Sequence, residues 1–157
     1  MTAVPDTDSR TIESAYQQLR PALVRVAYLL TSDAQEASDL VQDAFEAVLP
    51  RWDAIDDHAA YLRRAVTNRA YNATRNRTRR SDKAYRAAHE RRDDAPDHEY
   101  LGDLIAALPP RQRAVVVLRF HLDLSYDEIA EHLGLRPGSV GPTLRRALDA
   151  LDQELTR

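Results

Sequence analysis

The sequence predicts an all-α fold made of two small helical domains joined by a linker. Apolar residues recur at steps of three and four along most of the 157 residues, which is the period of an amphipathic helix. No strand alternation and no internal repeat is convincing. A segment of mixed charge with little apolar periodicity separates the two periodic halves, so we expect two small bundles rather than one.

The first predicted domain spans residues 10–80 and begins with two amphipathic helices. One apolar face runs from Ile12 to Leu30 and predicts the first helix. Ser32 and Gln35 have the spacing of a capping box, which would start the second helix. That helix is expected to place its apolar residues inward, to present a polar opposite face and to stop at a proline. The inward residues are Ala37, Leu40, Val41, Ala44, Phe45, Val48 and Leu49, the polar ones are Asp39, Gln42, Asp43 and Glu46, and the proline is Pro50.

A long third helix is predicted from about Ala59 to the "RNRTRR" stretch, after a loop at residues 51–58. Beside its apolar positions it carries a second stripe at steps of three and four, which combines an aromatic ring, amides and guanidinium groups on one face. We call this face the amide–arginine stripe; it consists of Tyr61, Arg64, Asn68, Asn72, Arg75 and Arg79.

Residues 81–97 are predicted to be a flexible charged linker, and residues 98–157 a second helical domain. In this domain Ser125 and Glu128 have capping-box spacing and open a helix that closes at Leu133. Gly134 follows at the turn, which is the arrangement of a helix-turn-helix. The second helix of such a unit docks in the major groove of DNA.

Gly141 and Pro142 stand where that second helix should recognise bases. A proline inside a helix costs roughly 3 kcal/mol, but in the first turn its missing N–H has no intrahelical acceptor to lose. We therefore predict that the helix starts late, near Ser139 as N-cap, or is irregular up to Pro142. Its base-recognising end would then be short and poor in side-chain donors.

Charge is distributed unevenly, although the net charge is only −3. Residues 1–58 carry 4 basic and 11 acidic side chains, residues 59–92 carry 11 and 2, and residues 93–157 carry 7 and 12. The resulting balances of −7, +9 and −5 place one basic block between two acidic segments. Such a block indicates a polyanionic partner, with nucleic acid as the first candidate.

Several other classes of protein are disfavoured. The chain has no cysteine, no signal peptide and no apolar stretch long enough to span a membrane, so we expect a cytoplasmic protein. Its five histidines show no metal-ligand spacing, and no phosphate loop, nucleophile motif or catalytic carboxylate pair is evident. We expect no enzyme activity, no metal and no other cofactor.

Two groups of motifs resemble a known family. "LPPRQRAVVVLRFHLDLSYDEIAEHLGLRPGSV" resembles region 4 of the sigma-70 family of transcription initiation factors. "YLLTSDAQEASDLVQDAFEAVLPRW", followed by "AAYLRRAVTNRAYNATRNRTRR", resembles region 2. The pair, covering about residues 12–80 and 98–155, is similar to an extracytoplasmic-function (group IV) sigma factor.

This resemblance implies a function and a set of site residues. The chain would bind core RNA polymerase, recognise promoter DNA and help to open it for transcription initiation. An anti-sigma protein is a further partner that is common in the family, although no residue here indicates one. The residues implied in core polymerase binding are Asp39, Leu40, Gln42, Asp43 and Phe45. The amide–arginine stripe and Trp52 are implied in minus-10 DNA binding, and Arg136, Ser139, Thr143, Arg145 and Arg146 in minus-35 DNA binding.

The residue types fit these roles. Capture of a melted strand requires aromatic faces, amide donors and cations for the backbone, all of which the amide–arginine stripe contains. Trp52 is equally compatible with a place in the core. Many family members carry an acidic residue where Asn72 stands.

Many also carry basic residues at or near Gly141, Thr143 and Leu148, and this chain has none at those three positions. Recognition of the minus-35 element would then be weak, and promoter choice would depend mainly on the minus-10 element.

Two other functions remain open from the sequence. The first is a dimeric helix-turn-helix regulator of the LuxR type, for which "LSYDEIAEHLGL" would suffice but which has no need of "DLVQDAF". The second is a degenerate sigma factor that binds polymerase or another regulator without recognising DNA, which Gly141 and Pro142 keep open.

Overall fold

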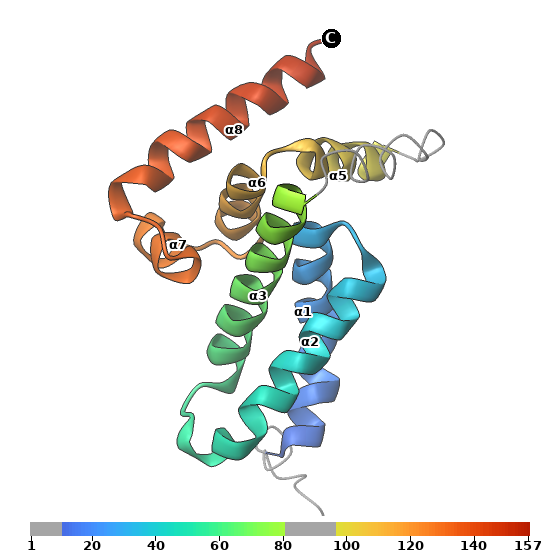
Figure 1. The fold of residues 1–157 in the computed structure, drawn as a ribbon, viewed down its shortest axis with the longest axis vertical. Coiled ribbons are helices and arrows are strands. Elements are labelled where there is room, and N and C mark those ends of the chain that lie inside the picture. Colours follow the sequence, from blue (N-terminus) through green and yellow to red (C-terminus); the bar gives the residue numbers. More distant parts are fainter. Residues whose placement is uncertain (1–10, 81–96) are drawn as a thin grey trace, which may run out of the picture.

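The computed structural model describes residues 11–80 and 97–157, except for the side chains of residues 78–80 and 97–99. The described residues form an all-α fold, as predicted (Figure 1). The first group of helices contains α1 (Ile12–Thr31), α2 (Ala34–Val48), the 3₁₀ segment η2 (Leu49–Ala54) and α3 (His58–Arg80). The second contains α5 (Asp97–Ala107), α6 (Pro110–Val116), the π-helical turn η3 (Val117–His121), α7 (Tyr126–Leu133), the 3₁₀ turn η4 (Pro137–Ser139) and α8 (Val140–Leu155). The predicted linker, residues 81–97, lies outside the described residues except for Asp97.

The first three helices pack side by side because each has one apolar face. Leu23, Val26 and Leu30 of α1 and Val41 of α2 are buried, and Leu62 of α3 packs with them. The last predicted inward residue of α2 is an exception, since Leu49 is 51% exposed. It begins η2, and the chain turns there before Pro50 so that its side chain leaves the apolar face.

The connection between α1 and α2 differs from the prediction by one residue. Asp33, and not Ser32, is the N-cap of α2, and its carboxylate accepts the Glu36 N–H at 3.0 Å. Ser32 instead ends α1 in the left-handed conformation, with φ 58°, and its N–H donates to the Tyr28 carbonyl. Because Ser32 is committed to ending one helix, the next residue caps the other.

The helix-turn-helix of the second group has the predicted caps of α7, but the side-chain cap predicted for α8 is not formed. Ser125 caps α7 by accepting the Glu128 N–H at 3.1 Å. Gly134 ends α7 with φ 66°, where a side chain would be strained. The α-helix α8 begins at Val140, so Pro142 lies in its first turn, as predicted. Ser139 precedes it without a side-chain cap bond, because its hydroxyl donates to the Arg136 carbonyl at 2.7 Å.

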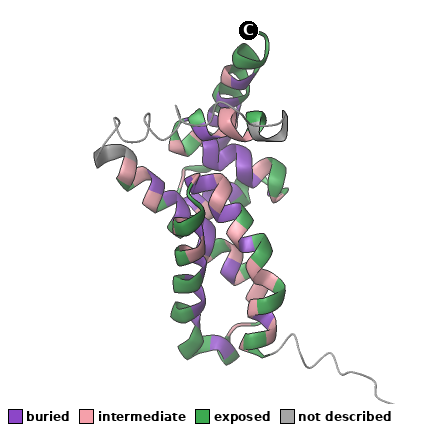
Figure 2. Ribbon diagram, turned by 90° about the vertical axis from the view of Figure 1, so that its right-hand side faces the viewer, coloured by how far each residue is buried: buried purple, intermediate pink, exposed green. Residues whose placement is uncertain are grey.

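The two groups of helices are in direct contact. α3 touches α6 and α7, and α1 touches α5, α6 and η3. Buried side chains of both groups form one continuous apolar cluster, and Figure 2 shows the buried positions passing from one group into the other. Most of α8 extends away from the first group (Figure 1). Within residues 11–80 and 97–157, no helix is both long and apolar enough to cross a membrane.

Candidate polymerase and nucleic-acid interfaces

The polar face of α2 is an exposed acidic surface. Asp39, Gln42 and Asp43 are exposed, and Leu40 is partly buried. Gln35 donates to the Asp39 carboxylate at 3.1 Å, so that carboxylate is oriented along the helix. The sequence-predicted docking residues therefore lie on one face, apart from one member.

Phe45 is the predicted polymerase-binding residue that does not lie on the exposed face of α2. It is buried and packs edge-on against Tyr16 of α1, with ring centroids 4.9 Å apart. The Tyr16 hydroxyl donates to Gln42 at 3.0 Å, which joins the polar face to α1. Beside these residues is an open groove of about 480 Å³ between α1 and the end of α2. Phe45 forms part of its wall, as does the exposed Leu49.

The amide–arginine stripe lies on the surface of α3, as its spacing predicted. Arg64, Asn68 and Asn72 are exposed, whereas Tyr61 and Arg75 are partly buried. The Asn72 amide donates to the Asn68 side-chain oxygen at 3.1 Å, so these two amides form a row. The Arg75 guanidinium lies over the Tyr71 ring, 5.3 Å from its centroid. The side chain of Arg79, the last member of the stripe, is outside the described residues.

Trp52 occupies the core rather than the surface. Its side chain is 8% exposed, and its indole is stacked on the His58 ring with centroids 3.7 Å apart. His58 also forms a hydrogen bond to the Trp52 carbonyl at 2.8 Å. This pair fixes the turn before α3, so Trp52 positions the stripe without presenting its ring to solvent.

The helix-turn-helix presents few cations. Arg136, Arg145 and Arg146 are exposed, and Ser139 is partly buried. Thr143 is buried, and its hydroxyl donates to the Ser139 carbonyl at 2.7 Å. It therefore has no accessible group for DNA in this structure, because the helix turns that position toward the core.

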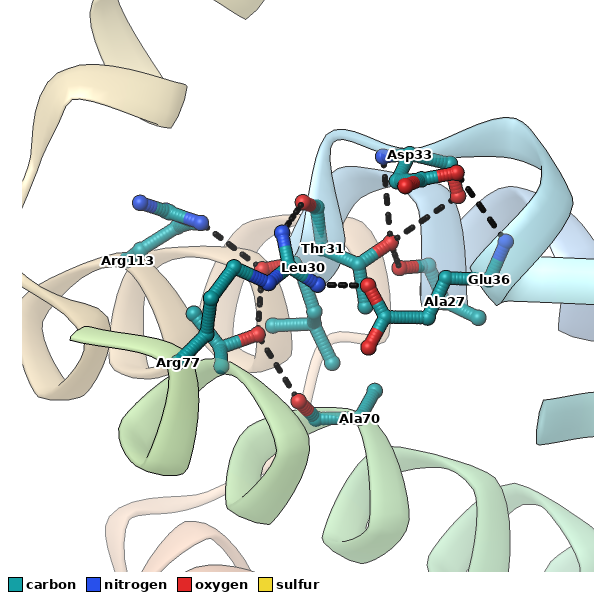
Figure 3. Close-up of polar contacts among 9 residues, drawn as sticks. Ala27, Leu30, Thr31, Asp33, Glu36, Ala70, Arg77 and Arg113 are labelled. Carbon is teal, nitrogen blue, oxygen red and sulfur yellow. Dashed lines mark hydrogen bonds and ion pairs between the residues drawn. The ribbon is translucent and has the colours of Figure 1, made fainter. Parts of the chain in front are cut away.

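Sequence reasoning missed a polar cluster at the C-terminal end of α1 (Figure 3). The last carbonyls of a helix have no intrahelical hydrogen-bond donors. Here arginine side chains from two other helices donate to them. Arg77 of α3 donates to the Thr31 carbonyl at 3.2 Å and forms an ion pair with Glu36. Arg113 of α6 donates to the Leu30 carbonyl at 2.8 Å.

Arg113 is 1% exposed although it carries a full charge. Its second terminal nitrogen donates to the carbonyls of Ala106 and Leu108, at 2.6 and 3.1 Å. One guanidinium therefore caps the ends of both α1 and α5, where the negative ends of the helix dipoles favour a cation. Nothing in the local sequence distinguishes it from the exposed Arg111 two residues earlier.

A second missed feature is the contact between the amide–arginine stripe and α7. Arg64 forms an ion pair of 2.7 Å with Glu131, and Asn68 donates to the His132 carbonyl at 3.3 Å. His121 lies near the same boundary, and its pKa is below the ordinary value. The larger cause is partial burial, which disfavours the charged imidazolium, and the smaller is the positive charge of Arg25. Groups from the two halves thus face one another at several points.

The chain matches two protein-family models, one over each group of helices. Residues 15–80 match sigma-70 region 2, and residues 98–151 match sigma-70 region 4. The chain belongs to the sigma-70 family. Within that family it is an RNA polymerase sigma factor of the extracytoplasmic-function type, and sigma factors are not enzymes but bind core polymerase and promoter DNA.

Individual relatives agree with this assignment. The sigma factor is 38% identical over 141 residues to the RNA polymerase sigma-E factor of Streptomyces coelicolor, covering 85% of this chain and 80% of that one. It is 36% identical over 155 residues to the sigma-E factor of Streptomyces antibioticus, covering 91% and 83%. Its fold is similar to that of the sigma factor RpoE from Bartonella quintana, solved in complex with the anti-sigma factor NepR. The TM-score is 0.68 at 22% identity, over 92% of this chain and 96% of that one.

In this sigma factor, α1 to α3 make up region 2, and α5 to α8 make up region 4. The acidic face of α2 and the amide–arginine stripe both belong to region 2. The α3–α7 contact therefore joins region 2 to region 4. The region 2 match also disfavours the LuxR-type alternative, because a helix-turn-helix regulator has no need of these three helices.

Proposed function

We propose that this sigma factor acts in the cytoplasm and binds core polymerase, the minus-10 strand and the minus-35 duplex through three separate surfaces. The α2 face, with Asp39, Gln42 and Asp43, docks on a basic surface of core polymerase, and Leu40 packs at its edge. The amide–arginine stripe captures the melted minus-10 strand. Arg136, Arg145 and Arg146 hold the minus-35 duplex. An anti-sigma protein is a further proposed partner, supported by the complex of the Bartonella quintana relative.

The observation that carries this proposal is the composition and exposure of the amide–arginine stripe. Amides in a row, one partly exposed aromatic ring and guanidinium groups lie on one helix face. Unpaired bases are bound by stacking and by amide hydrogen bonds, while cations bind the backbone phosphates. A helix that only held the region together would not need these three kinds of group together at its surface.

Replacing Arg75 with alanine is expected to lower promoter-dependent transcription about tenfold, because a charge-assisted contact to phosphate is lost. Run-off transcription with purified core polymerase measures this effect, on promoters selected from a randomised template library. Arg69→Ala is the matched control, since Arg69 is exposed on the same helix but outside the stripe. Both variants should bind core polymerase as the unchanged protein does. Equal losses in the two variants would argue against a specific role of the stripe.

Promoter choice is expected to depend mainly on the minus-10 element. Gly141 and Pro142 lie in the first turn of α8, Thr143 is buried, and the exposed arginines suit phosphates, which carry no sequence information directly. Exchanging the minus-35 sequence of a selected promoter should therefore change transcription by less than about fivefold, whereas one mismatch at a base that is recognised directly costs roughly 1–3 kcal/mol. A larger loss in run-off transcription would place base recognition in region 4 after all.

Absence of transcripts from every template, with core binding retained, would favour the degenerate sigma factor that binds polymerase without recognising DNA.

A further inference from the structure

A series of hydrogen bonds runs from α1 to the exposed face of α2, two helices that pack side by side (Figure 1). Arg20 of α1 donates through its Nε–H to the Tyr16 hydroxyl at 3.0 Å. This hydroxyl donates to the side-chain oxygen of Gln42 in α2, also at 3.0 Å. The Gln42 amide nitrogen in turn donates to the Glu46 carboxylate at 3.2 Å. The series therefore connects a cation on α1 to a carboxylate on α2 through a phenol and an amide.

The direction of these hydrogen bonds follows from the chemistry of the two end groups. A guanidinium can only donate, so the Tyr16 oxygen accepts from Arg20 and its own proton goes to Gln42. An ionised carboxylate can only accept, so the Gln42 group that faces Glu46 is the amide nitrogen. Both neighbours of Gln42 therefore require the same orientation of its amide, with the oxygen toward α1 and the nitrogen toward Glu46.

The Tyr16 ring is itself held in place by its surroundings. It packs edge-on against Phe45, and the Arg20 guanidinium lies 5.8 Å from its centroid. The Arg20 Nη2 group also donates to the Ser38 hydroxyl at 2.9 Å. These two Arg20 hydrogen bonds go to hydroxyl groups and not to carboxylates, which fits a role in orienting Tyr16 rather than in neutralising the acidic face.

An oriented Gln42 amide is useful on a binding surface. Gln42 is exposed, and fixing a flexible exposed side chain when a partner binds costs conformational entropy. Here the side chain is already fixed in the free protein. Since Glu46 takes one of the two amide N–H groups, the second is left to donate to an acceptor on a partner.

We propose that Tyr16 and Arg20 are positioning residues for the α2 face: they hold the Gln42 amide in the orientation in which it donates to an acceptor of core polymerase. Polymerase binding then depends on α1 as well as on α2, although neither positioning residue needs to touch the polymerase. Phe45 contributes from the core, because it supports the Tyr16 ring. This inference rests on the proposed function of the α2 face.

Tyr16→Phe removes the hydroxyl and keeps the ring that packs against Phe45. It is expected to weaken binding of core polymerase by about threefold to tenfold, because Gln42 must then be immobilised during binding. Titration of the labelled full-length chain with purified core polymerase, without DNA, measures this loss. Tyr28→Phe is the matched control, since it removes a hydroxyl farther along the same helix, and it should change the affinity by less than about 1.5-fold. The urea midpoints of both variants should stay close to that of the unchanged protein.

A double-mutant cycle tests whether Tyr16 acts through Gln42. In a Gln42→Ala background, Tyr16→Phe should change core affinity by less than about 1.5-fold, because there is no amide left to orient. Arg20→Met should weaken core binding in the unchanged background and lose that effect in Gln42→Ala. Arg20→Lys keeps a donor for the Tyr16 hydroxyl and should therefore lose less affinity than Arg20→Met.

The orientation of the amide can be observed without polymerase. In heteronuclear NMR spectra of the free chain, the two side-chain N–H signals of Gln42 should differ from those of Gln18, an exposed glutamine of α1. Tyr16→Phe should move the Gln42 signals toward those of Gln18 and increase the motion of the amide. A residue that only stabilised the fold would leave these signals unchanged as long as the protein stayed folded.

Three results would overturn the inference: Tyr16→Phe weakens core binding no more than Tyr28→Phe, it weakens binding equally in the Gln42→Ala background, or the Gln42 signals do not respond to it. If Gln42→Ala and the charge reversal of Asp39 and Asp43 weaken core binding but Tyr16→Phe does not, only the positioning role is wrong. If none of these variants weakens binding, the proposed function of the α2 face fails and the positioning role fails with it.

Discussion

Replacement of Arg113 by alanine is expected to destabilise the folded chain by about 3–5 kcal/mol. The substitution would remove the buried guanidinium that donates to the Ala106 and Leu108 carbonyls. It would also remove a donor from the Leu30 carbonyl, to which the Thr74 hydroxyl donates as well. It would also leave a cavity, because the side chain is almost fully buried. Urea unfolding followed by circular dichroism measures the free energy of unfolding directly.

Arg111→Ala is the control for this prediction. Arg111 is exposed in the first turn of α6, so its loss should change stability by less than about 0.5 kcal/mol. Amide hydrogen exchange adds a second readout, since the last turns of α1 and α5 should show a larger increase in exchange than other helices in Arg113→Ala. A loss below about 1 kcal/mol for Arg113→Ala would mean that water replaces the guanidinium at these carbonyls.

Reversing the charge of the α2 face is expected to weaken core polymerase binding on the order of 100-fold, or about 2.7 kcal/mol. Asp39 and Asp43 are one helical turn apart and exposed, so arginine at both would meet a basic partner with like charge. Both side chains are at the surface, and the fold should be retained. Titration of labelled sigma factor with purified core polymerase, without DNA, measures the change.

The control changes the same charge elsewhere in region 2. Asp53→Arg with Asp56→Arg alters two exposed carboxylates in and after η2, away from the α2 face. This pair should leave core affinity within about twofold of the unchanged protein. If both double variants lost affinity equally, net charge and not the α2 face would explain the effect.

Features set by local spacing could be predicted from the sequence. The apolar period placed the helices, and the same period placed the polar side chains of the amide–arginine stripe on a surface. Ser125 was identified as an N-cap from Glu128 three residues later, and the late start of α8 followed from the position of Pro142. The residue roles at the polymerase and DNA surfaces stay predictions that the transcription and binding experiments would test.

Features set by distant residues could not be predicted. Arg113 donates to backbone carbonyls 83, 7 and 5 residues away, and backbone carbonyls have no signature in a sequence. Arg64 and Glu131 are 67 residues apart. Even the cap of α2 depended on a neighbouring element, because Ser32 and Asp33 are both good caps and the end of α1 decided between them.

The π-helical turn η3 makes the length of its segment important, separately from its composition. Leu122 donates to the Val117 carbonyl, five residues back, so the turn holds one residue more than an α-helical turn. Deleting one residue there would replace the π-helical turn with an α-helical one and shift the downstream elements relative to α6. Arg145 and Arg146 would then change their position relative to region 2 without any change in the helix that carries them. Insertions and deletions in residues 117–121 are therefore expected to be tolerated much less well than substitutions at its exposed positions.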